Sequence, residues 1–152
     1  MASLRTLDED AWFLLKILKS DAEEFGLDPR ENREAPNGNR QGSYRCPVGR
    51  DIYQGVTAPP GALPWLGELE VEGTVPVDGH EVHWRYYFIE PRVHTDIEDD
   101  RLLGCSVRHK GIASAYNAAD QTRHMRGAIE AGKRWCRQNR YTWRPSMWDS
   151  GY

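Results

Sequence analysis

The stretch "LGELEVEGTVPVDGHEVHWRYYFIE", residues 66–90, constrains the fold more than any other part of the chain. Two runs that alternate apolar and polar residues flank Asp78-Gly79, a dipeptide that favours a two-residue type I′ turn. The register set by this turn puts Glu72 opposite Arg85 and gives the hairpin one apolar and one charged face. We expect the apolar face to enter the core, and the charged face to be wet or to meet a partner.

A helix is expected before the hairpin, at about residues 7–25. Apolar residues recur there at helical spacing, Thr6 followed by Glu9 fits a capping box, and Gly26 fits a C-terminal cap. Three further apolar residues lie beside or beyond the apolar stripe, which indicates a second contact surface: Trp12, Phe13 and Ile17.

The rest of the chain completes an α+β pattern. Alternation at 101–109 predicts a third strand, so the sheet spans about 65–109, and a stripe of small residues predicts a helix at about 114–139. Residues 28–61 lack periodicity and are expected to form a long irregular arm, and 140–152 an extended tail. The 152 residues are thus predicted to form a single domain with helices packed on a three-stranded, mainly antiparallel sheet.

Charge is unevenly distributed, although the net charge is only −3. Residues 8–24 carry six carboxylates and two lysines, whereas 121–144 carry seven cations and one carboxylate. The acidic side chains form a candidate partner face: Asp8, Glu9, Asp10, Asp21, Glu23 and Glu24. The basic side chains are candidate contacts to another subunit or to nucleic acid: Arg123, Arg126, Lys133, Arg134, Arg137 and Arg140.

The sequence supports no catalytic or metal motif. His80 and His83 of "HEVH" are three residues apart on a predicted strand, so they point to opposite faces, unlike zinc ligands on a helix. The acidic loop 96–100 lacks the glycine and closing glutamate of a calcium loop. Cys105 alternates onto the apolar side of its strand, and Cys46 near Tyr44 has no supporting base. We therefore expect no enzyme activity, no cofactor and no metal.

The sequence also bears on location. No apolar run reaches the roughly 18 residues that cross a bilayer, and the N-terminus lacks the pattern of a signal peptide. Three cysteines without close spacing suit a reducing compartment. We expect a cytoplasmic protein without a membrane partner, unless it is built into a particle.

The approach to the first strand, "GRDIYQGVTAPPGALP" at 49–64, resembles the tail-terminator or tail-completion family of long-tailed bacteriophages. The matching residues are Gly49, Arg50, Tyr53, Gly55, Pro59, Gly61, Ala62, Leu63 and Pro64. The Ala-rich "SAYNAADQTRHMRGAIEAG" matches the later helix of that family, and the likeness covers most of 7–139. It implies a homo-oligomeric virion ring that caps the tail tube and joins it to the head and to neighbouring virion proteins, without catalysis.

Two alternatives remain open. The basic helix, followed by Tyr141, Trp143 and Trp148, has the cations and stacking surfaces of a small nucleic-acid-binding accessory protein. The helix, three strands, helix order also resembles a double-stranded RNA-binding domain. An enzyme built on Cys105 or on the histidines is the third hypothesis.

Overall fold

A five-stranded antiparallel sheet in the order β1-β2-β3-β4-β6 forms the centre of the molecule. The computed structural model describes residues 2–27, 30–34, 42–46, 48, 52, 61–93, 101–111 and 118–146. The strands are β1 (Arg30–Glu34), β2 (Ser43–Cys46), β3 (Leu66–Glu72), β4 (Val82–Ile89) and β6 (Leu103–Gly111). The predicted α+β class is confirmed, with two more strands than expected.

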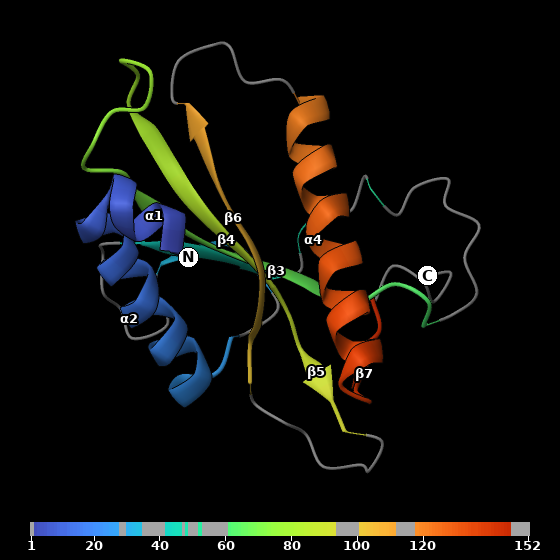
Figure 1. Cartoon of the computed structure of the whole chain (residues 1–152). Helices are drawn as coiled ribbons and strands as arrows, with labels where there is room; N and C mark the ends of the chain where they lie inside the picture. The colour runs from blue at the N-terminus through green and yellow to red at the C-terminus, as the bar shows by residue number, and fades with distance from the viewer. Residues whose placement is uncertain are drawn as a thin grey trace.

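Helices cover both faces of this sheet. Helices α1 (Ala2–Leu7) and α2 (Glu9–Phe25) lie on one face, and α4 (Ala118–Gln138) lies on the other (Figure 1). A second, two-stranded sheet pairs β5 (Pro91–Arg92) with β7 (Thr142–Trp143). The expectation that one face of the hairpin would be wet is therefore corrected, because α4 packs on much of it.

Each face of the sheet has its own apolar core. The core under α1 and α2 includes Leu4, Ala11, Leu15, Leu18, Leu69, Val71, Trp84, Tyr86 and Phe88. The core under α4 includes Leu66, Tyr87, Ile89, Met125, Ala128, Ile129 and Cys136. A Cβ atom on Gly132 of α4 would lie 2.6 Å from the Ile89 side chain and 2.9 Å from the Cys105 sulfur, so the small residue permits this close approach.

The first predicted helix, at about residues 7–25, is α2, and α1, which was not predicted, precedes it with Asp8 between the two. Asp8, and not Thr6, is the N-cap of α2, and its carboxylate accepts a hydrogen bond from the Ala11 N–H at 3.0 Å. The capping-box prediction was wrong because the Asp8 side chain satisfies this free helix donor instead. The predicted C-terminal cap is confirmed, since Gly26 has φ +74° and its N–H donates to the Ala22 carbonyl.

The predicted irregular arm contains two strands, which corrects that expectation. β1 pairs with β2, and β2 pairs with β3 so that Ser43 lies opposite Glu70. β1 consists of charged and polar residues, and β2 is only four residues long, so the sequence pattern did not reveal them. Most of the family-like stretch 49–64 lies outside the described residues, apart from Ile52 and 61–64.

The hairpin turn is confirmed, but the register is shifted. Val77 and His80 form a bridge around Asp78-Gly79, yet β3 pairs with β4 so that Glu70, not Glu72, lies opposite Arg85. The shift is two residues, so the two faces of the hairpin stay as predicted. Its cause is that the N–H groups of residues 74 and 75 donate to Asp8 rather than to β4.

The later elements fit their predictions closely. The third predicted strand is β6, and the last helix is α4, with residues 112–117 outside the described part. The tail begins with β7 and a bridge between Pro145 and Pro64, and residues 147–152 are not described. Within the described part of the chain, no helix is long and apolar enough to span a membrane.

Candidate interaction surfaces and a buried charged cluster

The outer side of α2 carries exposed carboxylates and an exposed aromatic ring. Glu9, Asp10 and Glu24 are exposed and have no ion-pair partner among the described residues, and Phe13 is 58% exposed. We call these four residues the acidic surface. Glu23 already has partners within the chain. Its carboxylate lies 2.5 Å from the Lys19 ammonium and accepts a hydrogen bond from the Leu102 N–H at 3.0 Å.

Two predicted members of the acidic face do not contribute in the expected way. Asp21 is half-buried and already interacts with other residues. Asp8 is buried and accepts hydrogen bonds from the Thr74 hydroxyl at 2.6 Å, the Thr74 N–H at 2.7 Å and the Trp84 indole N–H at 3.1 Å. Asp8 is thus a structural link between α2 and the hairpin, and it is inaccessible to a partner.

The basic side chains of α4 form a stripe along one side of the helix. Spacings of three, four and seven residues place the following on that side: Arg123, Arg126, Lys133, Arg134 and Arg137. We call these five residues the basic stripe. Two are paired within the helix, Arg123 with Asp120 and Lys133 with Glu130. The other three are exposed and have no ion-pair partner in the described part of the chain, as is also true of Arg140 beyond the helix.

Aromatic rings lie near the C-terminal end of α4, and one of them contacts the stripe through Arg137. Trp135 is 37% exposed and its ring centroid is 5.3 Å from that of Tyr141, while the Arg137 guanidinium lies 5.9 Å from the Trp143 ring. Tyr141 and Trp143 are half-buried, which limits their use as stacking surfaces, and Trp148 lies outside the described residues.

The potential near the start of α4 is positive. Burial lowers the pKa of His124, and the nearby charges of Arg108 and Arg123 lower it further. Arg108 lies on β6, so this strand adds to the positive charge of the helix.

A buried charged cluster lies on the α4 face of the sheet, formed by Glu68, Glu70, His83, Arg85 and Tyr87. The Arg85 guanidinium bridges the two glutamates, with Nη1 3.1 Å from Glu68 Oε2 and Nη2 2.7 Å from Glu70 Oε2. The second oxygen of Glu70 lies 2.7 Å from His83 Nδ1. The sequence paired Arg85 with Glu72 and therefore missed this cluster, although the Glu alternation in β3 opposite a basic residue was the signal.

The buried charges of the cluster are only partly compensated by opposite charges and hydrogen bonds. Burial raises the pKa of Glu68, and the charge of Arg85 offsets this only in part. Burial also raises the pKa of the Tyr87 hydroxyl, and Glu68 adds to the effect. Among the described residues, Arg85 Nε and the Tyr87 hydroxyl have no hydrogen-bond partner of regular geometry. The cluster is therefore only partly satisfied.

Cys105 and His109 lie on opposite faces of the sheet. Cys105 lies in the core under α4, whereas His109 stacks edge-on against Trp84 on the other face at 5.3 Å. Burial raises the pKa of Cys105 to about 12 and that of Cys136 to about 11, so neither thiol is appreciably ionised near neutral pH.

The structure also shows where the histidines that were considered as metal ligands lie. His80 lies exposed beside the turn, and His83 belongs to the charged cluster. No group of three His, Cys, Asp or Glu side chains in the described part of the chain could hold a metal ion. The acidic loop 96–100 and the Cys46 side chain lie outside the described part.

Comparison of the chain with models of protein families, with curated proteins and with solved structures finds no match. Function is therefore inferred from the charge, exposure and contacts of these surfaces.

Proposed function

We propose that the protein is a non-enzymatic assembly protein that forms a homo-oligomeric ring. The observation that carries this proposal is the placement of two oppositely charged helices on opposite faces of one sheet (Figure 1). α2 has five carboxylates and two lysines, whereas α4 has five cations and two carboxylates. Contact between the acidic surface of one subunit and the basic stripe of the next uses two different faces, and such heterologous contacts repeat until a ring closes.

The two surfaces have complementary roles in this contact. Exposed ion pairs contribute only about 0 to 1 kcal/mol each, so charge mainly orients the subunits and selects the register. Phe13 on α2 is an exposed aromatic side chain of the acidic surface that would add apolar area.

Within this class, the proposed role is that of a tail-terminator-like virion protein of a long-tailed bacteriophage. The support is the sequence resemblance at 49–64 and 114–132, together with the charge placement. In this role the ring would assemble in the host cytoplasm, cap the tail tube and join it to the head.

Charge-swap variants test the ring. We expect the wild-type protein at about 50 μM and low salt to give a multi-subunit mass by native mass spectrometry and light scattering. Arg126→Glu with Arg134→Glu should give monomers, as should Glu9→Lys with Glu24→Lys, because each places like charges at the contact. An equimolar mixture of the two double variants should assemble again, since each supplies the charge that the other lacks.

The matched control is Glu72→Lys, an exposed reversal on β3 that belongs to neither surface and should leave the mass unchanged. A wild-type protein that is monomeric at every concentration would contradict the ring. A mixture that fails to reassemble would contradict the α2–α4 contact. Absence of the protein from purified phage particles, measured by mass spectrometry, would contradict the virion role while leaving the ring intact.

A second candidate function is nucleic-acid binding through the basic stripe. It is favoured by Arg126, Arg134 and Arg137, which are exposed and have no ion-pair partner within the described part of the chain. Binding to single- and double-stranded DNA and RNA should then weaken steeply with salt, and Arg134→Ala should lower the slope of log K against log[salt] by about 1. No retention on any of these nucleic acids at low salt would rule this function out.

A further inference from the structure

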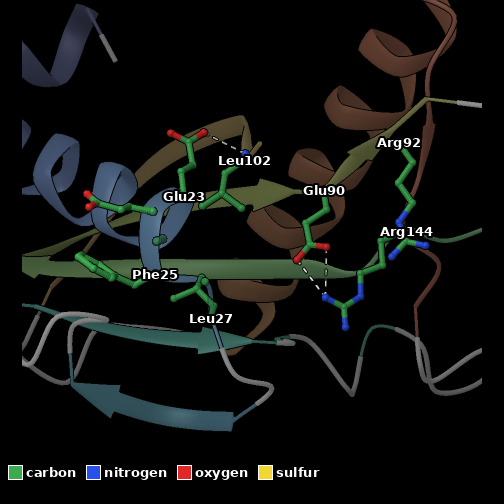
Figure 2. Close-up of a pocket in the computed structure, with 10 residues that line it drawn as sticks. Glu23, Phe25, Leu27, Glu90, Arg92, Leu102 and Arg144 are labelled. Carbon is green, nitrogen blue, oxygen red and sulfur yellow. Dashed lines mark hydrogen bonds and ion pairs between the residues drawn. The ribbon is translucent and has the colours of Figure 1, made fainter. Parts of the chain in front are cut away.

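A cleft of about 520 Å³ lies between the C-terminal end of α2 and the paired strands β5 and β7 (Figure 2). Its apolar lining comes from Phe25, Leu27 and Leu102, and its charged lining includes Glu90, Arg92 and Arg144. Figure 2 shows both arginines on the side opposite Phe25 and Leu27. The volume falls in the range typical of small-molecule sites.

Arg144 is held in a fixed position on this wall. Its Nη1 donates to both oxygens of Glu90 at 3.1 and 3.2 Å, and its guanidinium lies 4.1 Å from the centroid of the buried Trp65 ring. The bonds to Glu90 use only Nη1, so the other N–H groups of the fork remain for a ligand. A guanidinium stacked on an aromatic ring and paired in this way is preorganised.

Arg92 supplies the second cation of the wall. Its backbone is fixed by the β5–β7 pairing, because the Thr142 hydroxyl donates to the Arg92 carbonyl at 3.1 Å. Its side chain is half-buried and has no ion-pair partner among the described residues. Two guanidiniums and one carboxylate leave a single net positive charge on this wall.

The opposite wall is apolar and partly negative. The carbonyl groups at the end of α2 have no partner further along the helix, so this end carries the negative part of the helix dipole. The Glu23 carboxylate is turned toward the Leu102 N–H, as the dashed line in Figure 2 marks. An amine or amide N–H of a ligand would be favoured here, beside the apolar side chains of Phe25 and Leu27.

We propose that this cleft binds an apolar amino-acid residue with a free α-carboxylate, either as a free amino acid or as the C-terminal residue of a peptide. The carboxylate pairs with Arg92 and with the free N–H groups of Arg144, since a guanidinium fork matches carboxylate geometry. Over the whole cleft, the two guanidiniums face three carboxylates, Glu23, Glu24 and Glu90, so a ligand with a single negative charge is favoured over a dianionic phosphate. The apolar side chain contacts Leu27 and Leu102. This inference does not require the proposed ring, although Glu24 of the acidic surface also lines the cleft.

Titrations of the ¹⁵N-labelled full chain, followed by amide chemical shifts and calorimetry, test the site. The probes are leucine, N-acetyl-Ala-Ala-Leu with a free carboxylate, the same peptide as its C-terminal amide, and inorganic phosphate. At least one carboxylate probe should shift the amides of Gly26, Leu27 and Arg92. The amide should bind at least about tenfold more weakly than the acid, which is the size of effect for one lost charge-assisted hydrogen bond. Binding by leucine identifies a free amino acid as a ligand, and binding by the peptide alone identifies a chain end.

Arg92→Gln should weaken binding by at least about tenfold, whereas Arg108→Gln, which removes an exposed arginine of β6 that does not line the cleft, should not change it. Both variants should retain the wild-type spectrum elsewhere, because the pairing of β5 with β7 is made by the backbone. No shift with any probe at about 10 mM, a concentration that reveals even weak binding, would overturn the proposal. Equal affinity for the acid and the amide, equal affinity for phosphate, or unchanged binding in Arg92→Gln would overturn it as well.

Discussion

Two buried carboxylates, Asp8 on the α2 face of the sheet and Glu68 on the α4 face, are each 1% exposed yet differ in electrostatic state. Burial alone would raise the pKa of Asp8, but the hydrogen bonds from Thr74, Ala11 and Val75 outweigh it and hold the pKa below its ordinary value. For Glu68 burial dominates over Arg85, and the pKa is raised. Hydrogen bonds to the carboxylate outweigh desolvation at Asp8, whereas desolvation outweighs the charge of Arg85 at Glu68.

Because of this difference, Asp8 and the charged cluster should differ in whether they can be substituted without loss of stability. The Asp8 oxygens accept five hydrogen bonds, so the ionised form is fully solvated by the protein. The Glu68 carboxylate depends mainly on one guanidinium, and such partly satisfied clusters carry a desolvation cost that pairing does not fully offset. Asp8 should therefore be irreplaceable, whereas the charged cluster should be replaceable as a unit.

Asp8→Ala should have the largest effect, a loss of about 4 kcal/mol in the free energy of unfolding. The reason is that several buried donors, including the Trp84 indole N–H, lose their acceptor at once. Urea denaturation followed by tryptophan fluorescence measures the change. Asp10→Ala, two residues away and exposed, is the control and should change stability by less than about 0.5 kcal/mol. Equal losses in the two variants would show that Asp8 is not a structural link.

Arg85→Met should cost about 3 kcal/mol, because Glu68 is then left buried without its main counter-charge. The double variant Glu68→Leu with Arg85→Met should recover to within about 1 kcal/mol of the wild type, since a packed apolar pair avoids the desolvation cost of both ions. A double-mutant cycle in urea measures both values. If the double variant is as unstable as the single one, the cluster is as indispensable as Asp8.

The contributions of Asp8 and Glu68 to the stability of the fold should depend on pH in opposite directions. A lowered folded pKa means that the stability given by Asp8 is present above its unfolded pKa and is lost as the pH falls from about 4 toward 2. A raised folded pKa means that the contribution of Glu68 is present below its unfolded pKa and is lost as the pH rises from about 4.

Thermal unfolding of Asp8→Asn and Glu68→Gln across this range checks the signs. The advantage of the wild type over Asp8→Asn should disappear at low pH. The stability of Glu68→Gln relative to the wild type should instead increase as the pH rises toward neutrality. If the stability of the two variants, relative to the wild type, changed with pH in the same way, Asp8 and Glu68 would not differ in electrostatic state.

The smallest effect is expected at the rim of the cluster. The side chains of His83 and Glu70 are 28% and 18% exposed, so water compensates for much of a lost contact. His83→Gln should change the free energy of unfolding by less than about 1 kcal/mol. A loss as large as that of Arg85→Met would place His83 within the buried part of the cluster.

Sequence patterns predicted the elements with strong periodicity. The α2 stripe, the two faces of the hairpin and α4 follow from apolar spacing, because in each case burial of one apolar face contributes most to the stability of the element. β1 was missed because Arg30–Glu34 is made of charged and polar residues, and β2 because Ser43–Cys46 is too short for alternation to be recognised, although its Tyr44 enters the core.

The sites were harder to predict than the fold. Exposure of the basic stripe followed from its helical spacing, but the burial of Asp8 did not, because its partners at Thr74 and Trp84 are distant in the sequence. The Glu68–Arg85 pair was missed by a two-residue register shift that Asp8 itself helps to cause. The cleft beside Arg144 is formed by four separate segments, and local patterns carry no information on which distant segments meet.

The long sequence separation between Asp8 and its hydrogen-bond donors also affects the order in which the chain folds during synthesis. Its acceptor oxygens bind donors that lie 66 to 76 residues later in the chain, so α2 emerges from the ribosome without its tertiary anchor. Closing so long a loop is entropically costly until the hairpin has formed from its own local contacts. We therefore expect β3 and β4 to fold first and to recruit the N-terminal helices afterwards, which would make the beginning of this chain one of the last parts to become native.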